Sequence, residues 1–322
     1  MKAVCVSCFN YYNNRIKYVE QILKKEGYNV YYITSDFDHI DKIRYTVERS
    51  NTIQIHVNPY YKNLSVQRLL SHYFLLSIPF RIWRKLRDNN INAADIIITQ
   101  CKLYQEKINY VLNKTKTYTL YLTKEESKIQ SAPIIDPNII NICYLGSINN
   151  IIDMSSISQL LANINKIKPV VLHIIGDGEN REKFIENVKS SGVNVIFYGK
   201  IYDEQKKREI FDKCSFGINM MKKTVCVGLT MKSIDYFQAG LPILNNIQVD
   251  TEQLVKEYNI GFNVRDKNVE SVAVRIANVD IKELMEMREN TRRVFEKLFS
   301  LEAFNKRLVD VIKEMSIYEK RL

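Results

Sequence analysis

The stretch GLTMKSIDYFQAGLPIL, residues 228–244, places an amine and a carboxylate where they could bind a phosphorylated ligand. Its pattern predicts a helix over 230–239 that ends at Gly240 and is followed by an apolar strand. Lys232 and Asp235 are three residues apart and therefore lie on one face of this helix. Because a helix N-terminus attracts anions, the pair could bind a phosphate and a sugar hydroxyl. The alternative is that Asp235 lies on the solvated side of an ordinary helix.

A second candidate for phosphate binding is IIGDGEN, residues 174–180, a Gly-Asp-Gly turn between a predicted strand and a predicted helix. The sequence has no G-x-x-x-x-G-K-[ST] motif and no G-x-G-x-x-G after its first strand. It therefore lacks the main signs of a P-loop or dinucleotide-binding fold. Since any tight turn from strand to helix can use glycines, Gly176, Asp177 and Gly178 alone do not identify a ligand.

Short apolar runs that alternate with helical patterns would position these residues. Such alternation is typical of parallel sheets covered by helices on both faces. We therefore expect an α/β fold with two Rossmann-like domains that face a central cleft and have mostly parallel sheets. The strands predicted for the first half are 2–8, 28–34, 52–58, 94–99 and 117–123, with helices over 13–26 and 101–113. Those predicted for the second half are 139–146, 169–176, 193–199, 214–220, 241–246 and 260–264, with closing helices over 280–297 and 301–320.

The length of 322 residues and one proline-containing segment predict where the domains divide. A chain of this length exceeds the usual limit for a single hydrophobic core, so two domains are expected. SAPIIDPNII, residues 131–140, contains two prolines and is the best linker candidate. We place one Rossmann-like domain at 1–130 and the other at 141–300. The helix at 301–322 is expected to pack outside the second sheet and to bridge back to the first domain.

Composition and cysteine usage are those of an ordinary soluble protein, with 46% hydrophobic and 26% charged residues. No apolar run reaches the ~18 residues that a membrane-spanning helix needs, and no signal-peptide cleavage site is recognisable, so we expect a cytoplasmic protein. The six cysteines are scattered and are interpreted as reduced core residues. Cys5 and Cys8 form a C-x-x-C, but on a strand they point to opposite faces, so no metal site is expected.

The net charge of +11, from 47 basic and 36 acidic residues, favours an anionic partner. Residues 66–87 contain no acid and combine arginines and a lysine with apolar and aromatic side chains. This composition is typical of an amphipathic helix at an anionic membrane surface. The alternative is a core helix with a basic outer edge and a break at Pro79. Nucleic-acid binding is not expected, because no helix-turn-helix, zinc-finger or RNA-binding signature accompanies the charge.

Resemblance to a known family is carried by three segments, 170–184, 193–201 and 228–244. Their order and spacing resemble the nucleotide-sugar-binding domain of GT-B glycosyltransferases, most closely the retaining family 4 enzymes. NICYLGSI, at 141–148, resembles the strand and turn that open that domain, and 287–312 resembles the family's closing helices. In the first domain the resemblance is looser and rests on 34–45, 60–74 and 93–108.

The resemblance implies a donor site in the second domain. The nucleobase would stack beside the turn at 198–201, whose backbone groups would read its edge. Asp235 would hold the ribose hydroxyls; it is one methylene shorter than the usual glutamate but still accepts two hydrogen bonds. Lys232 and the helix N-terminus would neutralise the donor phosphates. The expected donor-binding residues are Gly146, Ser147, Gly176, Asp177, Gly178, Tyr198, Gly199, Lys200, Ile201, Gly228, Leu229, Thr230, Met231, Lys232 and Asp235.

Three departures from the family pattern affect this site. Ser147 stands where many members carry a phosphate-binding arginine. Neutralisation of the donor phosphates would therefore rest on Lys232, helped by Lys222 or Lys223. Val227 stands where the family's first glutamate would fall, which removes one contact that orients the donor sugar. The first domain also lacks a segment near 91–93, where relatives carry further strands.

The implied activity is transfer of a sugar from a nucleotide diphosphate, expected to be a uridine one, to a saccharide or lipid-linked acceptor at the inner membrane face. Such a reaction would serve bacterial-type surface polysaccharide or glycoconjugate synthesis. The resemblance implies retention of configuration, with the leaving phosphate taking the acceptor proton, and no cofactor or metal is expected. Acceptor-side candidates are Asn14, Asp36, Arg68 and His72. The alternative, motivated by Val227, is a degenerate relative that binds a saccharide or a partner glycosyltransferase without catalysis.

Overall fold

The computed structural model describes residues 2–7, 14–36, 43–44, 46, 50–55, 74–92, 96–108, 116–129 and 131–319. These residues belong to two compact units. The first comprises Met1–Ile98, Ile108–Tyr118 and Asn305–Leu322. The second comprises Thr99–Lys107 and Thr119–Phe304.

The first unit contains a parallel sheet in the order β1-β2-β3, formed by β1 (Lys2–Ser7), β2 (Asn29–Ser35) and β3 (Thr52–Ile55). Helix α1 (Asn14–Lys25) connects the first two strands and buries Tyr18 and Ile22. The chain continues into α3 (Phe74–Asn92) and into a two-stranded sheet of β4 (Ile96–Thr99) and β5 (Lys116–Thr119). The strands predicted at 2–8, 28–34, 52–58 and 94–99 are therefore present, over 2–7, 29–35, 52–55 and 96–99 of the described residues.

Helix α3 runs without a break through Pro79, so the break that the alternative of a core helix placed at that residue is wrong. Pro79 lies only five residues after the start of the helix at Phe74. A proline at this place removes one backbone hydrogen bond in the second turn, and the rest of the helix continues beyond it. The upstream part of the basic segment, 66–73, lies outside the described residues.

The second unit is built on six parallel strands in the order β11-β10-β9-β6-β7-β8. They are β6 (Ile140–Leu145), β7 (Val170–Ile175), β8 (Asn194–Gly199), β9 (Phe216–Asn219), β10 (Ile243–Asn245) and β11 (Gly261–Asn263). Chain order runs outward from β6 in one direction and from β9 in the other. In such sheets the ligand crevice lies at the carboxyl ends of the two strands where the order reverses. That point here is between Leu145 and Asn219.

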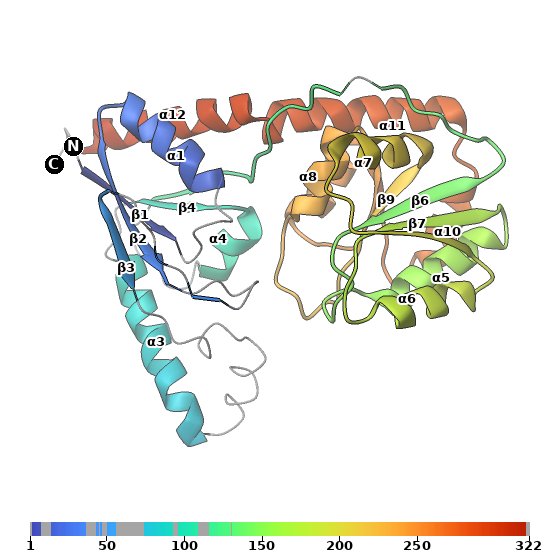
Figure 1. The fold of residues 1–322 in the computed structure, drawn as a ribbon, viewed down its shortest axis with the longest axis horizontal. Coiled ribbons are helices and arrows are strands. Elements are labelled where there is room, and N and C mark those ends of the chain that lie inside the picture. Colours follow the sequence, from blue (N-terminus) through green and yellow to red (C-terminus); the bar gives the residue numbers. More distant parts are fainter. Residues whose placement is uncertain are drawn as a thin grey trace. The chain divides into compact units, whose positions relative to one another are not determined.

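Helices cover both faces of this sheet (Figure 1). One face carries α5 (Met154–Asn165), α6 (Arg181–Lys189) and α10 (Val269–Ala277), which share a core with the inward residues of the strands. The other face carries α7 (Glu204–Lys213), α8 (Met231–Gln238), α9 (Asp250–Tyr258) and α11 (Ile281–Val294), with a second core. Because both faces are covered, the side chains of Ile142, Cys143 and Tyr144 in the central strand are fully buried.

The chain passes from the first unit to the second at Tyr118 and Thr119, upstream of the segment 131–140 that the prolines predict as a linker. Leu122 is buried in the second core, and the Thr123 hydroxyl donates to the Phe299 carbonyl at 2.9 Å. These contacts tie the residues before the prolines to the second unit.

A short helix, α4 (Lys102–Ile108), belongs to the second unit although its neighbours in sequence belong to the first. The carboxylate of Asp250, only 1% exposed, accepts hydrogen bonds from the backbone N–H groups of Lys102 (2.8 Å) and Leu103 (3.0 Å). It also accepts one from the Tyr121 hydroxyl at 3.1 Å. A buried carboxylate with three donors satisfies the first amides of α4 and holds that helix in place.

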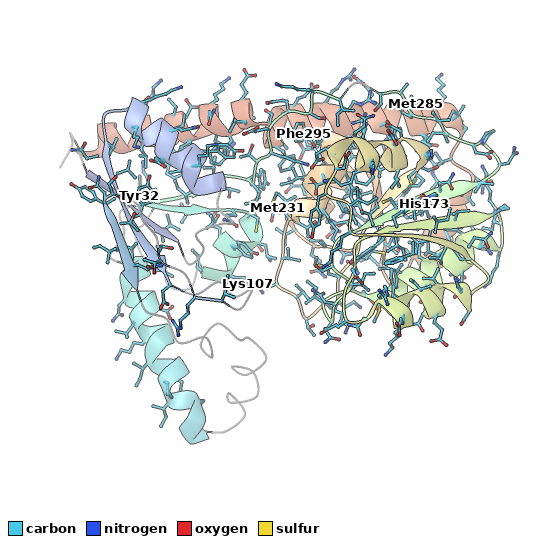
Figure 2. The ribbon with its side chains drawn as sticks, viewed as in Figure 1. Tyr32, Lys107, His173, Met231, Met285 and Phe295 are labelled. Carbon is cyan, nitrogen blue, oxygen red and sulfur yellow. The ribbon has the colours of Figure 1, made fainter. Side chains whose placement is uncertain are left out.

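The last two helices are joined by a π-helical segment. Helix α11 continues into Phe295–Phe299, and after Ser300 the chain forms α12 (Leu301–Glu319), whose residues from Asn305 belong to the first unit. The aromatic side chains of Phe295, labelled in Figure 2, and of Phe299 are buried in the second core according to their exposed fractions of 4% and 0%. Among the residues that the structure describes, no helix is long and apolar enough to span a membrane.

Three of the described cysteine side chains, Cys101, Cys143 and Cys214, are buried and unpaired, as expected of reduced core residues. Cys226 is exposed, so its interpretation as a core residue is wrong. It lies in the loop after β9 rather than in an apolar element. The side chains of Cys5 and Cys8 lie outside the described residues.

Candidate functional site

Glycines end the three neighbouring strands β6, β7 and β8. Gly146, Gly176 and Gly199 have φ angles of 118°, 141° and 71°, in the left-handed region that favours glycine. The Gly146 N–H donates to the Ile175 carbonyl at 2.9 Å, and the Gly176 N–H donates to the Gly199 carbonyl at 2.7 Å. A Cβ added at Gly176 would lie 1.9 Å from the Gly146 oxygen. Gly176 is therefore required for close packing of the strand ends, whereas Gly146 and Gly199 are favoured by their φ angles alone.

Lys232 reaches the same place from α8. Its amine lies 4.5 Å from the centroid of the Tyr144 ring, a cation–π contact, and 3.8 Å from the position of a Cβ added at Gly146. The Tyr144 hydroxyl donates to the Ser147 carbonyl at 2.8 Å, which ties the turn after β6 to the same ring. Burial lowers the pKa of Lys232 to about 8. An amine whose charge is poorly solvated gains from any anion placed beside it.

The N-terminus of α8 is capped by side chains of its own first turn. Thr230 accepts a hydrogen bond from the Ser233 N–H at 3.1 Å, and the Ser233 hydroxyl in turn accepts one from the Thr230 N–H. This capping box fixes the first turn. Met231, in the same turn and labelled in Figure 2, is exposed by 43%. Gly228 and Leu229 are buried. The structure thus brings Lys232 and Gly146 together beside a well-ordered helix start.

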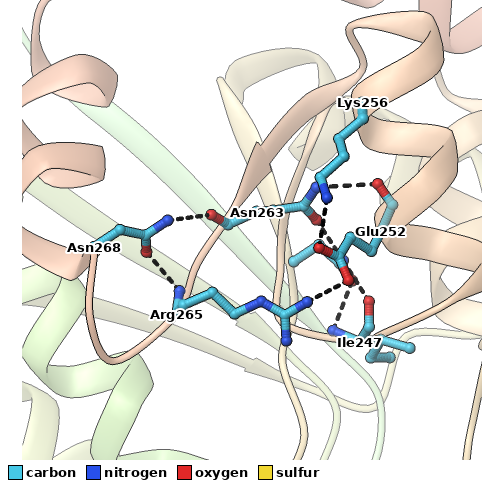
Figure 3. A network of polar contacts seen from close by, with 7 residues as sticks. Ile247, Glu252, Lys256, Asn263, Arg265 and Asn268 are labelled. Carbon is cyan, nitrogen blue, oxygen red and sulfur yellow. Dashed lines mark hydrogen bonds and ion pairs between the residues drawn. The ribbon is translucent and has the colours of Figure 1, made fainter.

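A ladder of three asparagines connects that helix start to the sheet. Asn219, Asn245 and Asn263 are in register at the carboxyl ends of β9, β10 and β11. The Asn219 amide donates to Asn245 at 3.1 Å, and the Asn245 amide donates to Asn263 at 2.8 Å. At one end the Thr230 hydroxyl donates to Asn219 at 2.8 Å, and at the other Asn263 donates to the Glu252 carbonyl at 3.0 Å (Figure 3). Because Asn219 and Asn245 are fully buried, the bonds from Thr230 to Asn219 and from Asn219 to Asn245 are made in a low dielectric.

Asp235 forms an ion pair that the sequence did not predict. Its Oδ1 lies 2.6 Å from the Lys124 amine, and the same amine lies 3.5 Å from Glu204 at the start of α7. Both members of the Asp235 pair are about one-fifth to one-quarter exposed, at 22% and 24%. Asp235 is therefore neither buried nor on a fully solvated helix face. No local signal marks Lys124, because it is 111 residues away in the sequence.

At the end of β8 the side chain of Tyr198 is held in place by His173. The Tyr198 hydroxyl lies 2.9 Å from Nδ1 of His173, whose Nε2 lies 3.0 Å from Asn141, and the two rings are stacked at 5.9 Å. Burial lowers the pKa of His173 to about 4, so this histidine is neutral at pH 7. The Gly199 carbonyl is occupied by Gly176, while Lys200 is exposed.

The other predicted residues are placed as follows. Asp177 contacts Arg181 at 3.5 Å on α6, and Lys223 forms an ion pair with Asp266. Asp36, in the first unit, pairs with Arg44 at 2.5 Å. Asn14 begins α1, but its side chain lies outside the described residues, as do Arg68 and His72.

Sequence reasoning missed Lys124 and the asparagine ladder. A signal for the ladder was present, since the predicted strands at 214–220, 241–246 and 260–264 each carry an asparagine near the carboxyl end. In a parallel sheet those ends lie side by side. The ladder could therefore have been predicted, whereas Lys124 could not.

Comparison with known proteins identifies one family. Residues 140–279 match the family model described as Glycosyl transferases group 1. No curated protein sequence matches the chain. Three similar solved structures are each 12% identical to it. HepE of Anabaena, in complex with UDP, has a TM-score of 0.66 over 98% of this chain and 100% of its own. WaaB, described as a lipopolysaccharide outer core galactosyltransferase in its apo form, has a TM-score of 0.63 over 98% and 100%.

The third similar structure is TarM of S. aureus, in complex with fondaparinux, alpha-GlcNAc-glycerol and UDP. Its TM-score is 0.56 over 90% of this chain and 53% of its own, so the chain spans about half the length of TarM. At these identities the likeness shows the fold, which is GT-B, as expected from the motifs.

The asparagine ladder predicts an unequal response to alanine substitution. Asn219→Ala should lower the free energy of unfolding by about 2 to 3 kcal/mol, because it removes one hydrogen-bond partner from each of two buried side chains, Asn245 and Thr230. Asn268→Ala, at the half-buried end of the network, should cost about 1 kcal/mol. Urea unfolding followed by circular dichroism measures both. Equal costs for the two variants would contradict the ladder's structural role.

Proposed function

We propose that this chain, whose residues 140–279 belong to the Glycosyl transferases group 1 family, transfers a sugar from a nucleotide diphosphate to a saccharide or lipid-linked acceptor. The observation that carries the proposal is the position of the Lys232 amine. It lies beside Gly146, where the strand order reverses and where α8 begins. An anion at this place would meet a half-buried ammonium and a helix N-terminus together.

Lys232 would act mainly on the leaving group. When the bond between the sugar and the diphosphate breaks, negative charge accumulates on the diphosphate. A poorly solvated ammonium and the amides of the first turn of α8 stabilise that charge more than they stabilise the intact donor. Following the family resemblance, we propose retention of configuration, with the leaving phosphate taking the acceptor proton. The proposal involves no cofactor and no metal ion.

Asp235 would hold the ribose. Its Oδ1 accepts from Lys124, and among the described residues no other donor reaches the carboxylate. A carboxylate offers about four lone-pair sites, so Asp235 can accept hydrogen bonds from a ribose diol while it keeps its ion pair. Lys124 would then orient the carboxylate toward the ligand. The nucleobase would lie near Gly199, Lys200 and Ile201.

The expectation of a uridine nucleotide is supported by analogy of fold, because HepE and TarM are both described as complexes with UDP. A saccharide acceptor is supported in the same way by WaaB, described as a lipopolysaccharide outer core galactosyltransferase. A synthetic role in bacterial-type surface polysaccharides or glycoconjugates follows from this analogy. The family match favours transfer over the alternative of a degenerate partner subunit.

Donor binding can be tested with nucleoside diphosphates alone. We expect UDP to raise the melting temperature more than ADP, GDP or CDP, and Asp235→Asn to weaken UDP binding by about tenfold through loss of a charge-assisted contact. Isothermal titration calorimetry measures the affinities, with Glu270→Gln, an exposed acid on α10, as a matched control. If no nucleoside diphosphate stabilises the protein at millimolar concentration, the donor site is wrong. Binding without turnover on saccharide acceptors would instead favour the partner role.

A second test uses the pKa of Lys232. Below about pH 8 the amine is charged and attracts a diphosphate; above it the free amine does not. UDP affinity should therefore fall about tenfold between pH 7 and pH 9. His173, with a pKa of about 4, does not titrate in this window. The Lys232→Met variant lacks the amine and should bind UDP weakly at both pH values. Any change in its affinity with pH measures the titration of UDP itself and is subtracted from the change in the parent protein. A parallel fall in the variant and the parent would refute the role of Lys232.

We also propose that α3 contacts an anionic membrane surface. Ile78, Ile82 and Leu86 follow one another at every fourth residue and are 40%, 53% and 53% exposed. Arg81 and Lys85, both exposed, lie on the same helix. Exposed apolar residues with adjacent basic ones are typical of helices that lie in the interface of anionic membranes. This arrangement would bring the enzyme to lipid-linked acceptors at the inner face of the cell membrane.

Vesicle co-sedimentation tests the membrane proposal. Arg81→Glu with Lys85→Glu should lower binding to vesicles that contain phosphatidylserine by more than about 30-fold, because each basic residue near such a surface contributes about 1 kcal/mol. Ile82→Asp should lower it further. The control is Lys183→Glu with Lys189→Glu, which changes the net charge equally on α6. An equal loss in the control would show that net charge alone matters, and α3 would have no special role.

A further inference from the structure

A cavity of about 280 Å³ lies beyond the carboxyl ends of β9 and β10. Its walls come from the loop that follows β9, from the loop that follows β10 and from α4, all within the second unit. The cavity therefore adjoins the crevice edge at which Lys232 and Gly146 meet. Its lining residues are Leu103, Lys107, Met221, Lys222, Lys223, Thr224, Val225, Cys226, Val227, Asn246, Ile247 and Gln248.

The charged side chains of this lining are all lysines. Lys107, Lys222 and Lys223 contribute amines from two different segments, and no carboxylate is among the lining residues that the structure describes. Lys223 is compensated by Asp266, which leaves the amines of Lys107 and Lys222 without a counter-charge in the described part of the chain. Val227, where the family resemblance implies a glutamate, adds no negative charge. A ligand that carries a carboxylate would be attracted by these two amines.

The lysines are held by fixed backbone. Asn246 accepts a hydrogen bond from the Met221 N–H at 2.8 Å and donates to the Met221 carbonyl at 3.0 Å. The next residue, Lys222, donates its N–H to the Ile151 carbonyl at 2.9 Å. These three bonds anchor the start of the loop that carries Lys222 and Lys223.

Lys107 is positioned by a different set of contacts, those that hold α4. It lies four residues after Leu103 and thus on the same face of α4, and both residues line the cavity. The buried carboxylate of Asp250 binds the first amides of that helix. Two unrelated segments of the chain therefore direct amines into one cavity.

The size of the cavity selects a small ligand. Pockets for drug-sized ligands occupy roughly 300 to 1,000 Å³. A cavity of about 280 Å³ is suited to a single sugar ring rather than to a whole nucleotide. The amide side chains of Asn246 and Gln248 add polar groups next to the amines.

We infer that this cavity binds a hexuronate, a sugar ring that carries a carboxylate, with Lys222 and Lys107 contacting the carboxylate. The inference rests on the proposed donor site, which would place the sugar end of a nucleotide sugar near the cavity. The hexuronate could be the sugar of the donor or the terminal sugar of the acceptor. Both sources present the same chemistry to the lysines, and the experiment separates them.

Calorimetry with three ligands tests the donor source. UDP-glucuronate should bind about tenfold more tightly than UDP-glucose, which has the same ring without the carboxylate. Lys222→Ala with Lys107→Ala should abolish this difference, measured as the ratio of the UDP-glucuronate and UDP-glucose affinities of the same protein, so that any change in the affinity for UDP itself cancels. Lys183→Ala, on α6 and away from the cavity, is the matched control and should keep the preference. Unchanged melting temperatures establish that the variants are folded.

Cys226 reports occupancy directly, because this exposed thiol lines the cavity. Alkylation by iodoacetamide, followed by mass spectrometry of the peptide that contains Cys226, should slow at least about fivefold with UDP-glucuronate and little with UDP or UDP-glucose. In the acceptor arm, a glucuronate-terminated disaccharide is added together with UDP. Protection in this arm alone would assign the hexuronate to the acceptor.

The results that would contradict the hexuronate inference differ from those that would contradict the proposed donor site. If UDP binds but the glucuronyl and glucosyl donors are equivalent and neither arm protects Cys226, the hexuronate assignment is overturned while the donor site stands. Protection by a sugar phosphate but not by a glucuronate would overturn it as well. If UDP itself does not bind, the proposed function fails and the inference fails with it.

Discussion

The buried ladder from Asn263 through Asn245 and Asn219 to Thr230 is the interaction on which the candidate site depends. Each amide donates in the same direction, and the ladder ends on the residue that caps α8. A sheet edge alone leaves a following helix free to shift along the strands. Here the helix start is hydrogen-bonded to Asn219 on β9, and the ladder connects Asn219 to β10 and β11, so the backbone of Lys232 and Asp235 has a fixed position relative to Gly146. Buried polar groups of this kind favour one arrangement strongly, because any shift leaves an amide unpaired.

The site combines charges whose environments differ. The ammonium of Lys232 is poorly solvated and packs on the Tyr144 ring, which makes it responsive to an incoming anion. The carboxylate of Asp235 is already paired with Lys124, which orients it and reduces its net charge. Diphosphate and ribose would thus meet different electrostatic conditions within one turn of a helix. This division explains how one short segment could serve both parts of a nucleotide.

The cavity beyond β9 and β10 shows how a departure from a family pattern acquires a physical meaning. Val227 by itself indicates only that a glutamate is missing. Together with the amines of Lys107 and Lys222 it forms part of a positively charged wall, to which a glutamate would have added a negative charge. Lys107 takes part because Asp250 holds α4 in the second unit. A substitution that suggests loss of function in isolation is therefore compatible with a changed ligand.

The sequence by itself determined the α/β class, the position of nearly every described strand, the helix at 230–239 and the motif order that identifies the family. These are local properties, because the hydrophobic periodicity of strands and helices and the glycines of turns can be recognised within a few adjacent residues. It also determined that Lys232 and Asp235 share a helix face. Only the tertiary structure decided that Asp235 pairs with Lys124, that Asn219 and Asn245 form a ladder and that Lys107 joins Lys222 at one cavity. Each of these contacts joins residues that are far apart in the chain, and strand order and helix docking, which bring them together, leave no local pattern.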